Sequence, residues 1–328
     1  MTLPDEAARI AEEIRSMRIR GARLIARSAV EALQIVARES RAKDVENFLE
    51  ELTQAARSLL QTRPTAVSLP NGIRYVMRRV NASKGQVSLV EDIRSTAIEA
   101  AEDFIQNTKT AVQRIGEIGA RRIRDGDVVL THCNSSAAIS ILKTAWGQGK
   151  RFEVLVTETR PRFQGHLTAR ELASIGIPVT LVLDDAVRFY MQDVDKVLVG
   201  ADAITANGAL VNKIGTSMVA LAAHEAKVRV FVAAETYKFS PETMVGELVK
   251  IEERDPSEII SEAELKKLGP VRVRNPSFDV TPPEFIDLII TERGIIPPAG
   301  AILILEEVFG VVTPEELSEY QTYSLQEA

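Results

Sequence analysis

The chain has 328 residues, enough for about two domains at roughly 150 residues each. Its 40 basic and 46 acidic residues give a net charge of −6, which argues against a general binder of nucleic acid or of anionic membranes. The single cysteine excludes an intrachain disulfide and, with only three histidines, a cysteine-based zinc site. No apolar run reaches the roughly 18 residues of a membrane span, and we expect a cytoplasmic protein without a signal peptide.

The first 125 residues are basic and have a helical pattern. They carry 21 basic and 17 acidic residues, a net charge of +4, whereas the remainder carries 19 and 29, a net charge of −10. Apolar residues recur at helical spacing from Ile10 onwards, with a break at Gly21 and a long helical stretch over residues 86–118. These stripes predict a bundle with a buried apolar core, which we place at residues 1–120 as an N-terminal helical domain.

From Asp125-Gly126 onwards, short apolar runs alternate with helical segments. The continuous hydrophobicity of these runs is typical of strands buried on both faces of a parallel sheet. Such alternation predicts a Rossmann-like, doubly wound α/β domain over residues 121–328. No glycine-rich dinucleotide-binding motif follows any of the runs. The expected strands are residues 128–130, 152–156, 179–183, 197–199 and 228–232, and the expected helices are residues 135–146, 167–174, 217–226 and 282–292.

A polar turn after the first expected strand contains the lone cysteine. Cys133 lies at the carboxyl end of this strand, where doubly wound sheets bind their ligands, and just before a helix N-terminus, which favours a thiolate. The backbone N–H groups of Ser135, Ser136 and Ala137 are placed to hold a phosphate. The alternative for a lone cysteine is an inert buried residue, and we expect His132 beside it to be a packed or hydrogen-bonded side chain.

A second polar turn follows the expected strand 197–199. It places Asp202 at the same edge of the sheet as Cys133, and Asn212 and Lys213 follow a short way along the chain. A thiol, a carboxyl and a lysine at one sheet edge suit acid–base chemistry. The alternative is that the aspartate only caps a helix, which is common after a strand.

Several arginines stand at turns instead of in the middle of helices. Arg20, Arg23 and Arg63 lie at helix breaks of the basic half, and Arg160 lies in the polar loop after the expected strand 152–156. Guanidinium forks at such places suit a phosphate. A single surface arginine is nevertheless more often simply solvated, so each of these residues alone is a weak indication.

Seven segments, taken together and in order, resemble the aldose-1-phosphate isomerase family. That family includes methylthioribose-1-phosphate isomerases, ribose-1,5-bisphosphate isomerases and regulatory subunits of the translation-initiation exchange factor. The resemblance implies a helical domain followed by a Rossmann-like domain, and a homo-oligomer built from dimers, with hexamers among the bisphosphate enzymes. The segments are residues 20–22 (RGA), 63–67 (RPTAV), 131–134 (THCN), 158–169 (ETRPRFQGHLTA), 200–202 (GAD), 207–208 (NG) and 212–216 (NKIGT). The matches at residues 234–239 (AETYKF) and 294–298 (GIIPP) extend the resemblance over nearly the whole chain.

The resemblance also implies site residues. Cys133 and Asp202 match the catalytic pair, which the regulatory subunits typically lack, so an enzyme is favoured over a regulatory subunit. Arg23 and the pair Ser135-Ser136 stand where the methylthioribose enzymes usually have proline and glycines, which favours a second phosphate. By the same resemblance, the residues that hold the substrate are Arg20, Gly21, Ala22, Arg23, Arg63, Ser135, Ser136, Ala137, Gln164, Asn212, Lys213 and Lys238.

The implied reaction opens the ring of a sugar whose C1 carries a phosphate ester. We expect Asp202, kept protonated in an apolar strand-end pocket, to protonate the ring oxygen, and a Cys133 thiolate to move a proton from C2 to C1. This proton transfer needs no metal or redox cofactor. The expected substrate is ribose 1,5-bisphosphate, and the implied setting is nucleoside monophosphate breakdown; methylthioribose-1-phosphate isomerase is the alternative enzyme.

Overall fold

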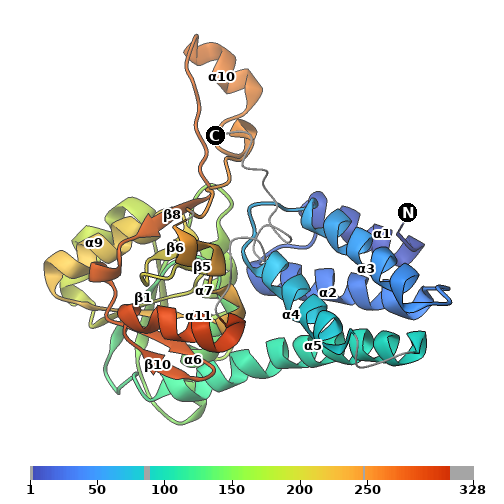
Figure 1. The fold of residues 1–328 in the computed structure, drawn as a ribbon. Helices are drawn as coiled ribbons and strands as arrows, with labels where there is room; N and C mark the ends of the chain where they lie inside the picture. Colours follow the sequence, from blue (N-terminus) through green and yellow to red (C-terminus); the bar gives the residue numbers. More distant parts are fainter. Residues whose placement is uncertain (1–2, 85–88, 247, 311–328) are drawn as a thin grey trace.

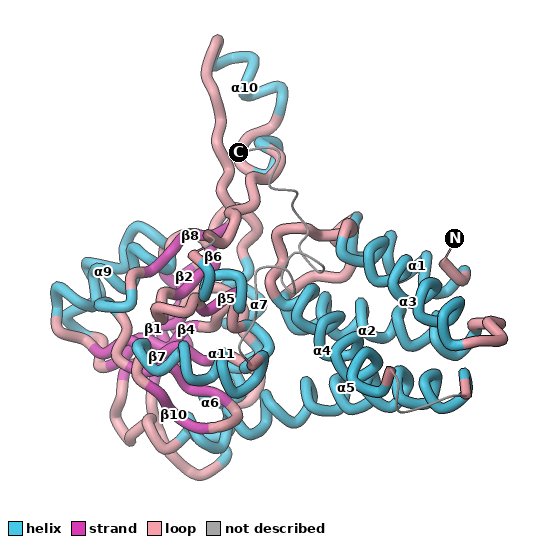
Figure 2. Tube along the Cα trace, in the orientation of Figure 1, coloured by secondary structure: helices cyan, strands magenta, loops and turns pink. Residues whose placement is uncertain are grey.

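The computed structural model of the protein describes residues 3–84, 89–246 and 248–310. Its N-terminal part is helical, as the apolar spacing predicts, and lies to one side of the strands (Figure 2). Gly21 adopts a φ of 85°, which glycine tolerates best, and it separates the first two helices as expected. The expected start of the long helix at Gln86 lies outside the described residues. The helices are α1 (Asp5–Arg15), α2 (Ala22–Glu39), α3 (Val45–Leu60), α4 (Ser68–Ser83) and α5 (Val90–Ala120).

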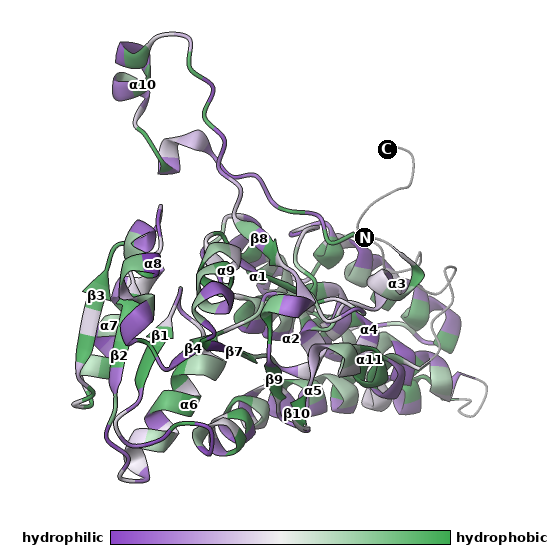
Figure 3. Ribbon diagram, turned by 90° about the vertical axis from the view of Figure 1, so that its left-hand side faces the viewer, coloured by the Kyte–Doolittle hydropathy of each residue, from purple (hydrophilic) through white to green (hydrophobic). Residues whose placement is uncertain are grey.

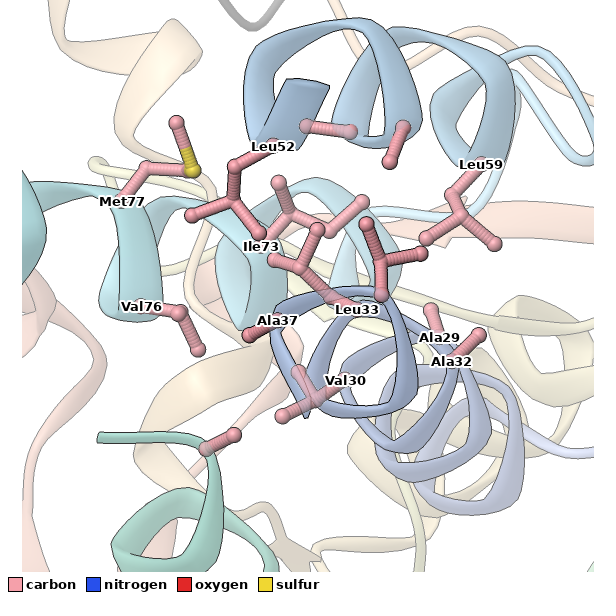
Figure 4. Close-up of a cluster of buried hydrophobic side chains, with 14 of the residues drawn as sticks. Ala29, Val30, Ala32, Leu33, Ala37, Leu52, Leu59, Ile73, Val76 and Met77 are labelled. Atoms are coloured by element: carbon pink, nitrogen blue, oxygen red, sulfur yellow. The ribbon is translucent and has the colours of Figure 1, made fainter. Parts of the chain in front are cut away.

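The core of this helical part is a cluster of apolar side chains from neighbouring helices. Leu33 of α2, Leu52 of α3 and Ile73 of α4 converge and are at most 1% exposed (Figure 4). Burying each such side chain stabilises the fold by about 1.5–3 kcal/mol. The helical spacing of these residues in the sequence is therefore the cause of the bundle.

The second part is built on a mostly parallel sheet of seven strands in the order β10-β9-β7-β4-β1-β2-β3, in which β10 alone runs antiparallel to its neighbour. A small antiparallel sheet, β5-β6-β8, lies beside it. The strands are β1 (Val128–Thr131), β2 (Glu153–Thr157), β3 (Val179–Val182), β4 (Lys196–Val199), β5 (Ala203–Ile204), β6 (Leu210–Lys213), β7 (Arg229–Ala233), β8 (Phe278–Thr281), β9 (Leu288–Thr291) and β10 (Gly294–Ile296).

Helices cover both faces of the large sheet, which confirms the predicted α/β fold. Because successive strand residues point to opposite faces, Val129 packs with α5, α6 (Ser136–Gly147) and α7 (Gln164–Ala173). Leu130 packs with the other layer, which contains α8 (Val187–Tyr190), α9 (Thr216–Ala226) and α11 (Ala301–Phe309). Helix α5 runs from the bundle to the sheet and so joins the two parts (Figure 1).

Two sequence expectations are wrong. Residues 282–292 are not a helix: they form a short 3-10 turn, Pro283–Phe285, and then β9, because Ile289 and Ile290 are fully buried when β9 pairs with β7. The run 179–183 is not buried on both faces, because β3 is an edge strand, and Leu181 is 46% exposed. The sequence patterns also miss β5, β6, β8 and β10, which are short and lie outside the regular alternation of strand and helix.

A long excursion of the chain, residues 251–277, projects from the body and is called the arm (Figures 1 and 3). Its outer end carries α10 (Glu262–Leu268). The two irregular segments that lead to and from this helix meet at the root of the arm, where the Arg254 N–H donates to the Asn275 carbonyl at 2.9 Å. In the parts of the chain that the structure describes, no helix has the length and apolar character needed to cross a membrane.

Candidate active site

A cavity of about 540 Å³ lies between the helical bundle and the carboxyl ends of β1 and β4. It brings together nearly all of the residues expected from the sequence, from segments up to about two hundred residues apart. Ala137 is the exception: its side chain packs in the core between the sheet and α6 and does not line the cavity. The expected residues in the lining are Arg20, Gly21, Ala22, Arg23, Arg63, Cys133, Ser135, Ser136, Gln164, Asp202, Asn212, Lys213 and Lys238.

Cys133 is held in an unusual backbone conformation just after β1. Its φ is 70°, in the left-handed region that non-glycine residues rarely adopt. Two buried threonines fix its peptide groups: the Cys133 N–H donates to Thr159 Oγ1 at 2.9 Å, and Thr168 Oγ1 donates to the Cys133 carbonyl at 2.8 Å. Thr159 itself has a φ of 61°, and its N–H donates to Asp184 at 2.8 Å. Strain of this kind persists only where surrounding contacts over-determine it, and it is common at active sites.

Burial raises the pKa of the Cys133 thiol to about 11. The nearby Lys213 lowers this pKa but does not offset the loss of hydration. The sequence expectation of a thiolate, based on the helix N-terminus that follows, is therefore wrong for the dominant form at neutral pH. His132 beside it is buried and hydrogen-bonded to Thr157 and to the Ile214 carbonyl, at 2.6 and 2.9 Å, as expected.

Asp202 reaches the cavity from the turn that follows β4, the strand next to β1. The two strand ends approach closely because Gly200 has no side chain: a Cβ there would lie 2.3 Å from Ser135 Oγ. Burial raises the pKa of the Asp202 carboxyl, although Lys238, Lys213 and two arginines around it act to lower that pKa. The direction of this shift agrees with the expectation of a protonated carboxyl. The expected apolar pocket is not found, because arginines and lysines line the cavity around Asp202.

Lysines at the cavity wall are held by buried partners. Lys238 Nζ lies 2.7 Å from Glu235 Oε2, and both side chains are less than a tenth exposed. Lys213 Nζ donates to the Ser277 carbonyl at 2.9 Å, and burial lowers the pKa of Lys213. Lys213 and its neighbour Asn212 lie in β6, so the pairing of this strand in the small sheet fixes the position of their backbone. The sequence patterns do not predict this strand.

The remaining wall is rich in arginine and holds residues that the sequence motifs miss. Arg63 Nη2 donates to Glu252 at 2.6 Å, and Arg254 and Arg162 also line the cavity. Arg160, a weaker expectation, does not line it. The Gln164 side chain, at the start of α7, has its Oε1 buried without a hydrogen-bond partner among the described residues. Glu252 and Arg254 lie in an irregular charged segment that carries no periodic or turn signal.

No group of three or more His, Cys, Asp or Glu side chains is arranged to hold a metal ion in the described ranges. What the lining offers is one thiol, one carboxyl with a raised pKa, and several cations. That set suits a small anionic ligand and the movement of protons on it.

The fold and the cavity together define an α/β protein with a cationic site at the carboxyl edge of a doubly wound sheet. The chain belongs to the initiation factor 2 subunit family, whose IF-2B model matches residues 18–298.

Relatives of this chain include isomerases. It is 58% identical to the ribose 1,5-bisphosphate isomerase of Thermococcus kodakarensis, with 94% of this chain and 97% of that protein covered. It is 56% identical to the enzyme of the same name from Pyrococcus furiosus, over 93% and 94% of the two chains. Among solved structures, the translation initiation factor eIF-2B of Pyrococcus horikoshii OT3 superimposes with a TM-score of 0.76 at 32% identity, over 92% of this chain and 100% of that one.

Proposed function

We propose that this protein is an isomerase that converts ribose 1,5-bisphosphate into ribulose 1,5-bisphosphate. The observation that carries the proposal is the meeting of Cys133 and Asp202 in one cation-lined cavity. Two relatives that are 58% and 56% identical bear the name of this activity.

The chemistry follows from the two groups. Protonated Asp202 donates its proton to the ring oxygen as the bond between C1 and that oxygen breaks. Cys133 as thiolate removes the proton from C2, which gives an enol, and returns it to C1, while Asp202 takes the proton of the C2 hydroxyl. Each group ends in its starting form, and the sugar has gained a C4 hydroxyl and a C2 carbonyl.

The raised pKa values of both groups bear on which form reacts. The reactive form, with the thiol ionised and the carboxyl protonated, is a minor one, because burial raises the pKa of the thiol to about 11. Burial also raises the pKa of Asp202, which favours the protonated carboxyl that this form requires. The reactive form contains the same number of protons as the form with a neutral thiol and a carboxylate. Phosphates bound to the surrounding cations add negative charge beside both groups, which favours the protonated carboxyl and opposes the thiolate.

Two groups of residues bind different parts of the substrate in this proposal. Arg20, Gly21, Ala22 and Arg63, with Asn212 and Lys213, hold the sugar and its C1 phosphate. The unpartnered Oε1 of Gln164 supports a contact with a sugar hydroxyl. The second phosphate and the remaining hydroxyls fall to Arg23, Ser135, Ser136, the Ala137 backbone and Lys238.

A coupled assay tests this function. It offers ribose 1,5-bisphosphate and methylthioribose 1-phosphate side by side and measures each ketose product. We expect turnover of the bisphosphate, and loss of turnover with retained binding in Cys133→Ser and Asp202→Asn. Turnover of the methylthio sugar alone would assign the alternative isomerase. No turnover of either sugar, with binding to a translation factor, would assign a regulatory subunit.

Specificity for two phosphates has its own test. Arg23→Met should weaken binding of the bisphosphate far more than binding of methylthioribose 1-phosphate. An equal loss for both sugars would contradict the assignment of Arg23 to the second phosphate.

Three further features belong to the proposal. The chain divides into a helical domain, residues 1–120, and a catalytic domain, residues 121–328. It works in the cytoplasm, in AMP breakdown. It is a homo-oligomer built from dimers, and the relation to the bisphosphate enzymes favours a hexamer. Exposed apolar side chains on two helices in contact, Phe189 of α8 and Leu221 of α9, support an interface on the sheet-containing part. Light scattering coupled to size-exclusion chromatography measures the number of subunits.

A further inference from the structure

Two residues at the root of the arm line the same cavity as the catalytic pair. Glu252 and Arg254 lie on the irregular segment that enters the arm and belong to no sequence motif. The Glu252 carboxylate lies between two guanidinium groups: one oxygen is 2.6 Å from Arg63 Nη2, and the other is 3.5 Å from Arg254 Nε. One carboxylate thus serves two arginines of the cavity wall.

These contacts leave a hydrogen-bond donor of the Arg254 guanidinium group without an acceptor. The Arg254 side chain is only 10% exposed, and its Nε is buried without a hydrogen-bond partner among the described residues. A buried N–H group without an acceptor is costly, whereas a phosphate offers acceptors that match the guanidinium fork. Arg63 differs, because its Nη2 makes a short, charge-assisted hydrogen bond.

Arg254 also lines the same cavity as the reacting groups, Cys133 and Asp202. Its charge lowers the pKa of both the Cys133 thiol and the Asp202 carboxyl, and Lys213 acts on both in the same way. In the proposed reaction these two groups work at C1, at C2 and on the ring oxygen. A phosphate on C1 lies next to these atoms, whereas a phosphate on C5 lies at the other end of the sugar. The position of Arg254 therefore matches the C1 phosphate.

We propose that Arg254 is a substrate-binding residue that holds the C1 phosphate together with Arg63, and that this phosphate displaces the Glu252 carboxylate from both guanidinium groups. The inference rests on the proposed function, which supplies the substrate. A phosphate dianion carries more charge than a carboxylate and has more acceptor oxygens, so it competes favourably for two arginines.

The exchange requires little rearrangement. The backbone of Glu252 is fixed, because its carbonyl accepts the Ser277 N–H at 2.8 Å, whereas its side chain is 19% exposed and so has a path to solvent. Arg63 remains paired before and after the exchange, which avoids a buried and uncompensated charge. Glu252 thus neutralises the arginine pair when no phosphate is bound, at the expense of some affinity for the phosphate.

Steady-state kinetics with ribose 1,5-bisphosphate tests the proposal. We expect Arg254→Met to raise KM by about 10-fold or more, because a charge-assisted hydrogen bond to the phosphate is lost. Glu252→Gln should lower KM by about 3-fold or more, because the competing charge is removed. The matched control is Glu253→Gln, on the adjacent residue, whose partner Arg274 lies outside the cavity lining; its KM should stay within about twofold of the parent value.

The double variant Glu252→Gln/Arg254→Met separates a ligand from a structural partner. If Arg254 only neutralises Glu252, the double variant regains the parent KM; if Arg254 binds phosphate, KM stays above that of Glu252→Gln alone. Ribose 5-phosphate, which lacks the C1 phosphate, serves as a competitive inhibitor whose Ki should change less than twofold in Arg254→Met.

The remaining outcomes distinguish failure of this inference from failure of the proposed function. An unchanged KM in Arg254→Met, or a raised KM in Glu252→Gln, would overturn the inference while leaving the function intact. Failure of the parent protein to convert the bisphosphate would instead reject the proposed function. Should Arg254→Met prove unfolded by circular dichroism, Arg254→Lys replaces it, since it keeps the charge but loses the fork; it too must raise KM, and an unchanged value refutes the proposal.

Discussion

The ionisation of Cys133 is directly measurable, because it is the only cysteine of the chain. Alkylation by iodoacetamide consumes the thiolate, so the rate at each pH reports the ionised fraction of this one side chain. The residue lines an open cavity and is only partly covered, so the reagent has access to it.

The structure sets the size of the effect. A thiol with a pKa of about 11 is about 0.1% ionised at pH 8, whereas one at the ordinary value of 9.0 is about 10% ionised. We therefore expect alkylation at pH 8 to be about 100-fold slower than that of an unfolded cysteine, and to rise about tenfold per pH unit up to pH 10. The sign follows from burial, which penalises the charged form.

Removal of a nearby cation adds a second measurement. Lys213 lowers the pKa of Cys133, so Lys213→Met should raise that pKa and slow alkylation further, by about 3- to 10-fold at pH 8. The control is Lys143→Met, which removes an exposed lysine paired with Glu171 outside the cavity lining. An alkylation rate that levels off at pH 9 or below, or that increases in Lys213→Met, would refute the reasoning.

Three other substitutions test the framework around the site. Thr159→Val removes the acceptor for the N–H of the catalytic cysteine and should lower kcat about tenfold with a smaller change in KM, as measured by steady-state kinetics. Gly200→Ala places a Cβ 2.3 Å from Ser135 Oγ, so it should lower both kcat and the melting temperature, the latter measured by calorimetry. Leu33→Ala, at a side chain 1% exposed, should lower the free energy of unfolding by about 3 kcal/mol in urea titrations, whereas Leu24→Ala, at 43% exposure on the same helix, should lower it by less than about 1 kcal/mol.

The thiol and the carboxyl have opposite tasks in the proposed reaction, and the same environment acts on both. Burial raises both pKa values, which helps Asp202 to act as an acid and hinders Cys133 from acting as a base. The surrounding cations lower both pKa values and so act against the effect of burial. Substrate phosphates bound to those cations would offset their charge, which favours the protonated Asp202 and opposes the Cys133 thiolate.

The sequence by itself determined five strands of the large sheet, the helical bundle and the strand ends that carry chemistry. The runs before Cys133 and Asp202 are apolar enough to be buried strands, and parallel strands present their carboxyl ends at one edge. That argument placed both residues together without any knowledge of contacts, since β1 and β4 prove to be neighbours. Local periodicity likewise defined the helical bundle, because its apolar stripes must be covered.

Tertiary structure alone decided the electrostatics and the long-range partners. The helix N-terminus after Cys133 is visible in the sequence, but the burial that outweighs it depends on what packs around the thiol. Arg63 meets Glu252 across 189 positions of the chain, and no local pattern marks either end of such a pair. The wrong assignment of residues 282–292 has a similar explanation. Their apolar residues suit a helix or a strand, and the pairing of β9 with β7 is a long-range contact that the local pattern does not show. Periodicity is a local property of the chain, whereas burial and charge pairing are properties of the packed molecule.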